Sequence, residues 1–437
     1  MTEPVLCVVM HNTHVADLHA QENARIELRY TDAWLKSREA IPISLSMPLS
    51  TAVHESKVVT AFLWGLLPDN TETLRHYGTV FGVSPRNPVA LLTHMGEDCA
   101  GALQFVSPER LGAFTGTATG ARQLERITDA EVAADLRRVR RHGVAVTDRS
   151  SPGRFSLPGA QPKIALYRDE SGWARAIGRT ATTHILKPPA STFEGFAENE
   201  HFCLALAAAV GIRAARTHVQ RFEDEVAIVV ERYDRRWVDD TLERIHQEDS
   251  CQALGVHPEK KYESDGGPGA RAIAELLLES SSDSPEDVRS FLDALILNWA
   301  IAGTDAHAKN YSILHSGPRD IRMAPLYDVA SYLPYDGGEL HRVKLAMRIG
   351  REYRARRVTR NDWRNVANSL RVPKDEALSR VRHLLERIPE AASDVARASS
   401  ASGLEKSFVD ALAQKVRTNA QRCLKTFDAS EDQSDGA

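Results

Sequence analysis

The strongest constraint on the fold is a change of sequence pattern near Tyr233. Before it, short apolar or alternating runs dominate, and the β-branched run Val226–Glu231 is typical of a buried strand. After it, apolar residues recur at helical spacing. Ser284–Asp287 (SPED) is a helix start, with a capping serine, a proline at the first position and acids in the first turn. The helix should turn four residues inward: Phe291, Leu295, Ile296 and Trp299. We therefore expect an α+β fold in which a strand-containing half precedes a mostly helical half.

Residues 1–110 are expected to form a β-rich N-terminal subdomain. Val5–Met10 is a short apolar run, and Ile26–Tyr30 and Ile43–Met47 alternate apolar with polar residues, as half-buried strands do. Gly96–Phe105 is typical of a turn that leads into a strand.

Four further segments complete the expected organisation. Residues 111–154 are a linker with a helix from Asp129, and the main domain boundary lies between about 110 and 150. Residues 155–235 alternate strands with a helix over Glu198–Val210, which Gly211 ends. Residues 236–427 form a helical lobe. The acidic run 428–437 is expected to be disordered.

Composition excludes several classes of protein. The net charge is −4, so no global basic field indicates a nucleic-acid binder, although a local patch or a DNA-binding partner remains open. The five cysteines are scattered and never spaced as C-x-x-C, which disfavours a disulfide framework or a zinc cluster and favours a reducing cytosol. No stretch resembles a signal peptide or a membrane span. We expect a cytoplasmic protein.

Three oxygen-bearing side chains indicate phosphoryl transfer. This reaction needs a carboxylate for the attacking hydroxyl, oxygen ligands for magnesium and a cation on the phosphates. Asp305 and Asn310 lie five residues apart, as the base and a metal ligand do in protein kinases, and Asp328 follows a predicted hairpin. Such oxygen donors suit Mg²⁺. The alternative is that Asp305 and Asn310 only shape a turn and Asp328 only caps a helix.

Three upstream segments could complete a nucleotide site. In Phe155–Lys163 (FSLPGAQPK), the small Gly-Ala pair would let backbone N–H groups approach phosphates, although a plain hairpin turn is the simpler interpretation. Lys187 ends a strand and could reach the phosphates, with Glu198 or Glu200 as its partner; a solvated lysine is the alternative. The backbone at Glu231 and Tyr233 could bind adenine.

These motifs occur together and in the order of one known family. The chain resembles full-length HipA-type kinases, the toxins of type II toxin–antitoxin pairs, along nearly its whole length. The motifs that carry the resemblance are SLSMPLS (44–50), GLLPDN (65–70), GEDCAGALQF (96–105), SLPGAQPK (156–163), THILK (183–187), ENEHFC (198–203), ERYDRRW (231–237), HQEDSCQALG (246–255), KYESDGGPG (261–269), TDAHAKNYS (304–312), PLYDV (325–329) and KLAM (344–347). The implied fold is two-lobed and protein-kinase-like, with a β-rich N-terminal subdomain, an α/β nucleotide-binding region and a helical C-terminal lobe.

The resemblance also implies roles for residues and two cofactors, ATP and Mg²⁺. Catalysis is implied for Asp305 as the base, His307 and Asn310, and metal binding for Asn310 and Asp328. Ser156 matches a serine that such toxins phosphorylate on themselves. ATP binding is implied for Gly159, Ala160, Gln161, Lys163, Lys187, Glu231, Tyr233, Asp234 and Asp328.

The same resemblance implies partners and a biological role. A small helix-turn-helix antitoxin of the HipB type would hold the protein on operator DNA. The protein substrate would be a translation component, glutamyl-tRNA synthetase first among the aminoacyl-tRNA synthetases, with growth arrest and persistence as the result. A basic run could touch the operator backbone or only form a solvated face: Arg348, Arg351, Arg354, Arg356, Arg357 and Arg360. Two alternatives are a corepressor subunit with weak kinase activity and a small-molecule kinase.

Overall fold

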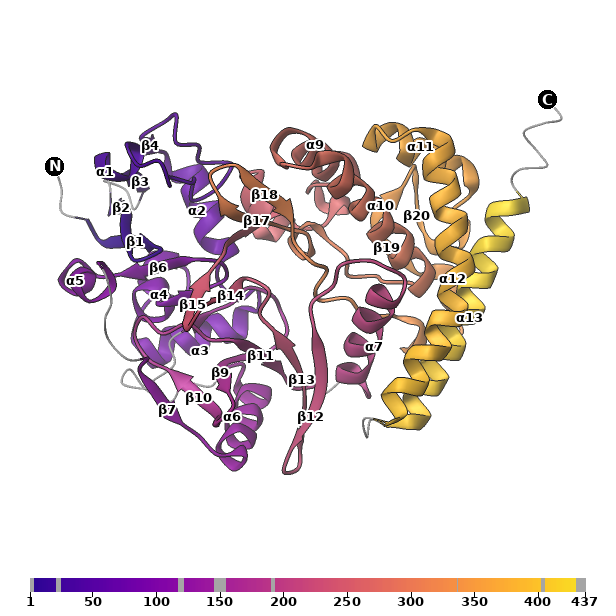
Figure 1. The fold of residues 1–437 in the computed structure, drawn as a ribbon, viewed down its shortest axis with the longest axis horizontal. Helices are drawn as coiled ribbons and strands as arrows, with labels where there is room; N and C mark the ends of the chain where they lie inside the picture. Colours follow the sequence, from indigo (N-terminus) through magenta and orange to yellow (C-terminus); the bar gives the residue numbers. More distant parts are fainter. Residues whose placement is uncertain are drawn as a thin grey trace. The chain divides into compact units, whose positions relative to one another are not determined.

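The protein was analysed as a computed structural model that describes residues 4–20, 25–116, 122–144, 155–189, 193–335, 337–401 and 405–429, without the side chains of 400 and 401 (Figure 1). Its contacts divide the chain into two compact units. The first unit comprises Met1–Ala190, Gln220–Glu259 and Ile313–Ile321. The second comprises Ser191–Val219, Lys260–Ser312 and Arg322–Ala437. Both units contain helices and strands, as expected for an α+β protein.

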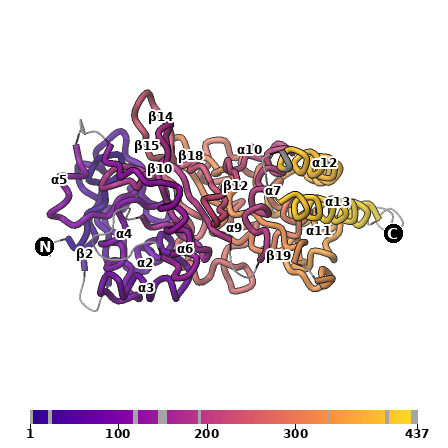
Figure 2. The backbone as a smooth tube through the Cα atoms, turned by 90° about the horizontal axis from the view of Figure 1, so that it is seen from below, coloured from indigo at the N-terminus to yellow at the C-terminus, as the bar shows by residue number. Residues whose placement is uncertain are grey.

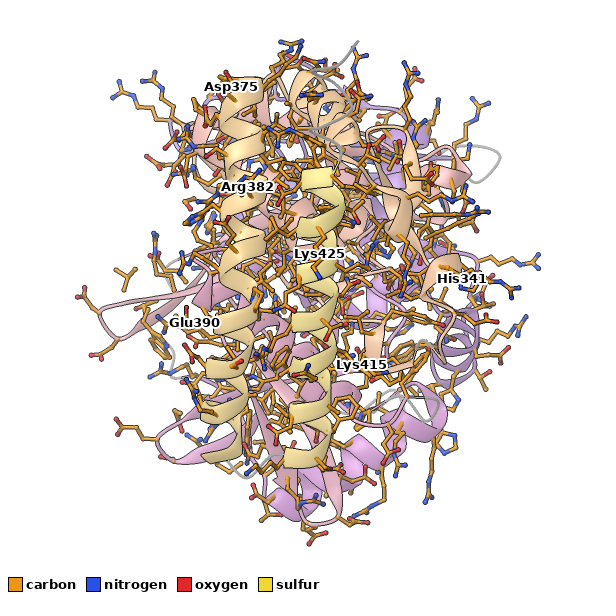
Figure 3. All side chains as sticks on the ribbon, turned by 90° about the vertical axis from the view of Figure 1, so that its right-hand side faces the viewer. His341, Asp375, Arg382, Glu390, Lys415 and Lys425 are labelled. Atoms are coloured by element: carbon orange, nitrogen blue, oxygen red, sulfur yellow. The ribbon has the colours of Figure 1, made fainter. Side chains whose placement is uncertain are left out.

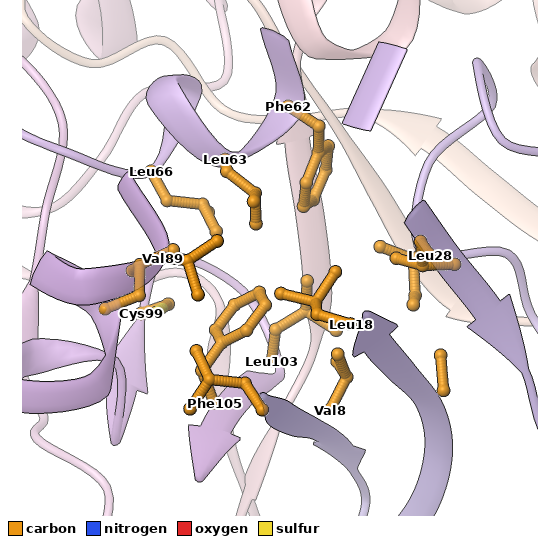
Figure 4. Close-up of a cluster of buried hydrophobic side chains, with 14 of the residues drawn as sticks. Val8, Leu18, Leu28, Phe62, Leu63, Leu66, Val89, Cys99, Leu103 and Phe105 are labelled. Atoms are coloured by element: carbon orange, nitrogen blue, oxygen red, sulfur yellow. The ribbon is translucent and has the colours of Figure 1, made fainter. Parts of the chain in front are cut away.

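An antiparallel sheet begins the first unit. Its strand order is β4-β3-β2-β1-β6. The strands are β1 (Leu6–Met10), β2 (Thr13–Ala20), β3 (Ile26–Tyr30), β4 (Val53–His54) and β6 (Leu103–Val106). The side chains of Val8, Leu18 and Leu28 meet Phe62 and Leu63 in one buried cluster (Figure 4). The strands expected at Val5–Met10 and Ile26–Tyr30 are confirmed.

The helices that cover this core were not predicted. They are α2 (Ser56–Gly65), α3 (Thr71–Phe81) and α4 (Pro88–Met95). Two shorter helices are α1 (Asp32–Leu35), which lies between β3 and β4 in sequence, and α5 (Leu111–Phe114), which follows β6. Asn70 caps α3 through its side-chain oxygen, and Asn87 caps α4, where Pro88 takes the first position. The subdomain therefore contains more helix than expected. Apolar content alone did not distinguish helices from strands in these segments, and the capping residues are what begin the helices.

The strand expected at Ile43–Met47 is wrong. Met47 N–H donates to Ser44 O at 2.9 Å, which closes a turn. The side chains of both serines bond to a distant segment: Ser44 Oγ and Ser46 Oγ donate to Gln252 O at 3.1 and 2.8 Å. The alternation of serine with apolar residues therefore serves contacts with a distant segment, and no ladder forms.

A second sheet lies mainly in the first unit, in the strand order β12-β13-β11-β9-β10-β7, and Thr217–Val219 of β12 belong to the second unit. The strands are β7 (Leu124–Arg126), β9 (Ile164–Asp169), β10 (Gly172–Ala176), β11 (His184–Lys187), β12 (Thr217–Phe222) and β13 (Glu225–Glu231). Helix α6 (Asp129–His142) packs on it through Val132, Leu136 and Val139, forming a hydrophobic core separate from the first. The expected helix from Asp129 and the strand Val226–Glu231 are confirmed.

The boundary expected between about 110 and 150 separates these two cores, but it does not separate compact units. Residues 1–190 belong to one unit. A short parallel pair of β5 (Asp98–Cys99) with β8 (Phe155–Ser156) joins the two parts across the expected boundary. Most of the expected linker after Gly143, residues 145–154, lies outside the described residues.

Strands continue beyond Tyr233, within the half that was expected to be mostly helical. The hairpin β14 (Arg235–Val238) and β15 (Thr241–Arg244) follows at once, and the short helix α8 (Ser250–Ala253) comes later. A three-stranded sheet contains β16 (His246–Asp249), β17 (Ser312–Gly317) and β18 (Asp320–Met323), the last two forming the predicted hairpin. Hairpin strands of about four residues carry too few apolar positions for a period to be recognised.

Helices dominate the second unit. They are α7 (Phe196–Ala209), α9 (Ala270–Ser280), α10 (Ser284–Ile301), α11 (Arg360–Leu370), α12 (Lys374–Ala401) and α13 (Lys406–Ala429), with one hairpin of β19 (Lys344–Ile349) and β20 (Glu352–Arg354). Helices α12 and α13 lie side by side (Figures 1 and 2). They are antiparallel, since the labels descend from Asp375 to Glu390 on α12 and rise from Lys415 to Lys425 on α13 (Figure 3).

Two boundaries in the second unit differ from the expected ones. The cap of α10 is Asp283, whose side chain accepts from Glu286 N–H, so Ser284 is already the first helical residue. The four residues expected to point inward from α10 are buried. Helix α13 includes Asp428 and Ala429, which were expected in the tail, and residues 430–437 lie outside the described part of the chain. No helix among the described residues is long and apolar enough to cross a membrane.

Candidate active site

A loop after helix α10 carries the predicted catalytic residues of the second unit. Asp305 O accepts from His307 N–H at 2.8 Å and from the Asn310 side-chain amide at 2.7 Å. His307 O in turn accepts from Asn310 N–H at 2.9 Å, which forms the short 3₁₀ turn Ala308–Asn310. Because the Asn310 nitrogen is bonded to the loop itself, its side-chain oxygen is the atom left for a metal ion. The loop exposes 67% of the Asp305 side chain and buries His307 and Asn310.

His307 supports this loop as a neutral ring. Burial lowers its pKa below the ordinary value, against a smaller opposing effect of the Asp305 carboxylate, so it is uncharged at neutral pH. Its Nε2 lies 3.8 Å from Asp305 Oδ1. Its Nδ1 is buried and has no hydrogen-bond partner among the described residues. The ring is thus placed beside the candidate base without carrying a charge.

Tyr262 is a member of the site that sequence analysis missed. Its hydroxyl donates to Asp305 Oδ1 at 2.5 Å, and its ring meets His307 edge-on at 5.0 Å. A tight turn holds it: Gly267 N–H donates to Tyr262 O at 3.0 Å, and a Cβ on Gly267 would lie 1.8 Å from Lys260 O. Tyr262 lies 43 residues before Asp305, a spacing without a periodic signal, and only the KYESDGGPG motif pointed to this segment.

Asp328 joins the same group from a second stretch of backbone. It has a positive φ of +56°, uncommon for a residue other than glycine, and its charge acts on His307. The neighbouring Tyr327 donates its hydroxyl to Lys309 O at 2.5 Å and lies 2.6 Å from Ser312 Oγ, which ties the Asp328 segment to the catalytic loop. The structure therefore gathers the three acidic and amide residues predicted for this unit around His307.

The predicted phosphate loop lies in the first unit. Gly159 has a φ of +107°, and a Cβ there would lie 2.7 Å from Lys163 Nζ, so the position needs glycine. Lys163 Nζ donates to Pro158 O at 2.5 Å, and Gln161 donates its side-chain amide to Pro188 O at 3.2 Å. Ala160 lies between them with an exposed side chain. The loop is thus internally bonded and tightly turned.

Ser156 begins this loop and is fully buried. It lies on β8, opposite Cys99 of β5, and its hydroxyl donates to Leu66 O at 2.8 Å. Leu157 beside it packs against Ala100 and Ala165. In this conformation a phosphoryl donor has no access to the hydroxyl.

Lys187 and the predicted adenine-binding residues lie on neighbouring strands of the first unit. Lys187 ends β11 opposite Ile228 and is 6% exposed, while Glu231 ends β13 opposite His184, at the other end of β11. Tyr233 follows in the turn after β13. Glu198 and Glu200, expected as partners of Lys187, are buried on α7 in the second unit.

A buried ion-pair network fixes the turn after β13. Arg232 donates to Asp98 at 3.2 Å and to Asp234 at 2.7 Å, and Arg235 donates to Asp98 at 2.9 Å. Arg244 adds a third bond to Asp98 at 3.1 Å. Burial opposes ionisation of both carboxylates, but Arg235 and Arg232 hold the pKa of Asp98 and of Asp234 below the ordinary range.

This network changes the interpretation of Asp234. Its two oxygens accept from Arg232 and from Gly101 N–H at 2.7 Å, and the residue is 4% exposed. The bonds give Asp234 a structural role in the turn, and the expected direct contact with ATP remains a prediction. The motifs GEDCAGALQF and ERYDRRW supply the charges of the network, but their spacing does not reveal that they meet.

The basic run after β19 does not form one continuous exposed face. Arg348 is paired with Glu263 at 2.8 Å, and Arg360 stacks over the Phe427 ring at 4.9 Å. Arg354 is half-buried, whereas Arg351, Arg356 and Arg357 are exposed. The candidates for the expected DNA contact are therefore Arg351, Arg356 and Arg357.

Comparison with known proteins gives a consistent result over the whole chain. The HipA N-terminal domain matches residues 6–106 and the HipA-like C-terminal domain matches residues 155–392. The sequence is 35% identical to the Sinorhizobium fredii protein Y4mE over 96% of this chain and 99% of that protein. It is 30% identical to the serine/threonine-protein kinase toxin HipA of Shewanella oneidensis over 84% of this chain and 83% of that protein.

The fold agrees with this result. It matches a chain from the solved complex of Shewanella oneidensis HipA, HipB and operator DNA with a TM-score of 0.80 and 25% identity, over 98% of this chain and 99% of that chain. This match confirms the expected two-lobed α+β fold.

Proposed function

Because the chain belongs to the HipA family of kinases, we propose that it transfers the γ-phosphate of ATP to serine or threonine hydroxyls of a protein. The observation that carries this proposal is the catalytic loop. It exposes the Asp305 side chain, bonds the Asn310 side-chain nitrogen within the loop and is tied to the Asp328 segment. A carboxylate, an amide oxygen and a second carboxylate are the oxygen groups that phosphoryl transfer uses.

Each residue has one proposed task. Asp305 orients the attacking hydroxyl and accepts its proton, while Tyr262 holds its carboxylate in place and the Asn310 amide bonds its backbone carbonyl. The neutral His307 supports this loop from its buried side. In the first unit, Lys187 would pair with phosphate oxygens, and the backbone of Glu231 and Tyr233 would bind adenine.

The residues present fit a magnesium nucleotide. Asn310 and Asp328 offer the hard oxygen donors that Mg²⁺ prefers, and Gly159 keeps the phosphate loop free of a Cβ that would meet Lys163. When bound, magnesium and ATP supply the phosphoryl group and the positive charge that balances its oxygens. In the second unit Asn310 and Asp328 would hold the metal ion, and in the first unit Gly159, Ala160, Gln161 and Lys163 are the residues that the family resemblance assigns to ATP.

We also propose the role of a toxin within a toxin–antitoxin pair. The substrate would be a translation component, with an aminoacyl-tRNA synthetase such as glutamyl-tRNA synthetase as the first candidate, and growth arrest and persistence would follow. The partner would be a HipB-like helix-turn-helix antitoxin bound to operator DNA, and the similarity to the HipA of the Shewanella oneidensis complex supports this. The alternative of a corepressor subunit with weak kinase activity is disfavoured, because every proposed catalytic side chain is present.

Transfer of ³²P from ATP to protein tests the proposal. Asp305→Asn removes the base and should lower the rate by about 10²- to 10⁴-fold. Asp375→Asn, on the exposed surface of α12 (Figure 3), is the matched control and should act as wild type. Undiminished transfer by Asp305→Asn would eliminate the mechanism. A phosphoproteome recorded after induced expression would identify the substrate and would separate a protein target from a small molecule.

A further inference from the structure

The first hairpin carries three potential metal ligands on one face. Strands β1 and β2 pair Cys7 with Asp17 and Val8 with Ala16, but a bulge then pairs Val9 with His14 instead of Val15. Because side chains alternate along a strand, a regular ladder would place His14 on the face opposite Cys7 and Asp17. The bulge re-aims the imidazole, as bulges do near functional sites, and brings it to the same face as the thiol and the carboxylate.

The ligand atoms of these three residues converge. The Cys7 sulfur, a His14 ring nitrogen and an Asp17 oxygen all lie within 4.8 Å of one another, and His14 Nε2 is 2.8 Å from Asp17 Oδ1. Among the residues that the structure describes, no other group of three histidine, cysteine or acidic side chains is this close. The convergence is therefore a particular feature of this hairpin.

The surroundings suit an ion that enters from solvent and is then held. Cys7 is 2% exposed and packs in an apolar cluster with Val9, Val106 and Phe114, which forms the floor of the group. The side chains of His14 and Asp17 are 28% and 23% exposed, so they form a reachable rim. The carboxylate of Glu109 also acts on Cys7 and adds negative charge nearby.

We propose that Cys7, His14 and Asp17 form a zinc site on the first hairpin. One sulfur, one imidazole nitrogen and one carboxylate oxygen are the ligand types of Zn²⁺, with a solvent molecule in the fourth tetrahedral position. Mg²⁺ and Ca²⁺ are disfavoured, because they select oxygen ligands. Binding converts the Cys7 thiol to a thiolate: the S–H bond breaks, the sulfur–zinc bond forms, and one proton passes to solvent.

The proposal does not depend on the proposed kinase function, since the site lies in the first unit on strands that carry none of the residues assigned to phosphoryl transfer. Zinc binding is expected to act locally, on the first hairpin. The ion would join β1 to β2 and would raise the thermal stability of the metal-loaded chain through preferential binding to the folded state.

Metal binding by the full chain, without a histidine tag, tests the site. Protein stripped with chelator and titrated with Zn²⁺ against a chromophoric chelator should bind one ion. Co²⁺ in its place should produce the near-ultraviolet charge-transfer absorption of a thiolate ligand. Cys7→Ser should abolish that absorption and lower zinc affinity at least about tenfold, and His14→Gln should also lower the affinity at least about tenfold.

Two comparisons make the result decisive. Cys423→Ser removes a buried cysteine of the other unit and should retain both zinc and the cobalt absorption. The melting temperature of each metal-free variant shows whether it folds. If Cys7→Ser does not fold, His14→Gln still tests the site, because His14 is partly exposed and its replacement disturbs the core less. Absence of the cobalt absorption in wild type, or zinc affinity unchanged in a folded His14→Gln, would overturn the proposal.

Discussion

Asp305 is the residue on which the proposed chemistry depends, and residues distant in sequence hold it. Sequence spacing, together with the surrounding motifs, predicted Asp305, Asn310 and Asp328 as one group, because a kinase-like loop places its oxygen donors at fixed offsets. Spacing could not find Tyr262, whose bond to Asp305 depends on a turn that only Gly267 permits. At this scale, local patterns predict candidate reacting groups, and the residues that position them become visible only in the fold.

Tyr262→Phe tests whether the phenol positions the base. Removing one hydrogen bond to a charged group costs about 1.5–3 kcal/mol, so kcat should fall roughly tenfold or more. The KM for ATP should not change, because the hydroxyl donates to the carboxylate of Asp305, whose proposed task is proton transfer and not ATP binding. Steady-state kinetics separates the two constants. A rise in KM with kcat unchanged would refute the positioning role, and Tyr353→Phe, a part-exposed tyrosine of the same unit, is the control.

At the scale of elements, the short pair of β5 with β8 joins two parts of the first unit. Its strands contain two residues each, yet they carry Asp98 of the buried network and Ser156 of the phosphate loop. Sequence analysis found both motifs but separated them by a domain boundary, because a two-residue strand has no detectable period. The pairing of β8 with β5 therefore anchors the phosphate loop to a distant segment of the chain, and the sequence of the loop gives no sign of this pairing.

Ser156 can be phosphorylated only if β8 leaves β5. A dianionic phosphate cannot replace a hydroxyl that is fully buried against Leu66 O. Ser156→Asp should therefore detach the strand, increase hydrogen exchange across residues 155–163 and weaken ATP binding. Ser156→Ala loses only one hydrogen bond and should keep slow exchange. Equal hydrogen exchange across residues 155–163 in the two variants would contradict the prediction that a charge at Ser156 detaches β8 from β5.

Asp98→Asn tests the network that fixes the turn after β13. Removing one charge from a buried pair costs about 3–5 kcal/mol of unfolding free energy. Since the fold lowers the pKa of Asp98 and of Asp234, their stabilisation is complete above the ordinary carboxylate range and is lost as pH falls below about 4.

Urea unfolding at a series of pH values provides the measurement. The difference between wild type and Asp98→Asn should be largest at neutral pH and shrink in acid. The exposed Asp239→Asn should match wild type throughout. A difference that grows as the pH falls would refute the assigned charges.

At the scale of the whole molecule, sequence patterns predicted the fold class and the long elements, but not how the chain divides. Long periodic segments such as α6 and β13 were identifiable because many residues share one period. The two units are built from interleaved parts of the chain, with residues 313–321 returning to the first unit. Such a division depends on contacts between distant segments, which no local pattern encodes.

The exposed arginines test the proposed assembly on DNA. The measurement is the affinity of the complex with the antitoxin for operator DNA at a series of salt concentrations. Replacing Arg351, Arg356 and Arg357 by Gln should make the slope of log affinity against log salt shallower, by about 0.9 for each arginine that touches a phosphate. Arg348→Gln, at the residue paired with Glu263, should leave the slope unchanged. Equal slopes for wild type and the triple variant would identify the run as solvated surface.

Asp305 is proposed to accept the proton while Asp328 holds the magnesium nucleotide, and one paired measurement separates these roles. Magnesium-dependent ATP binding by calorimetry and single-turnover phosphoryl transfer are recorded for Asp305→Asn and Asp328→Asn. Both variants should lose transfer by about 10²-fold or more, and only Asp328→Asn should lose the magnesium dependence of ATP binding. Undiminished transfer in both variants, or magnesium-dependent binding retained by Asp328→Asn, would contradict this assignment of roles.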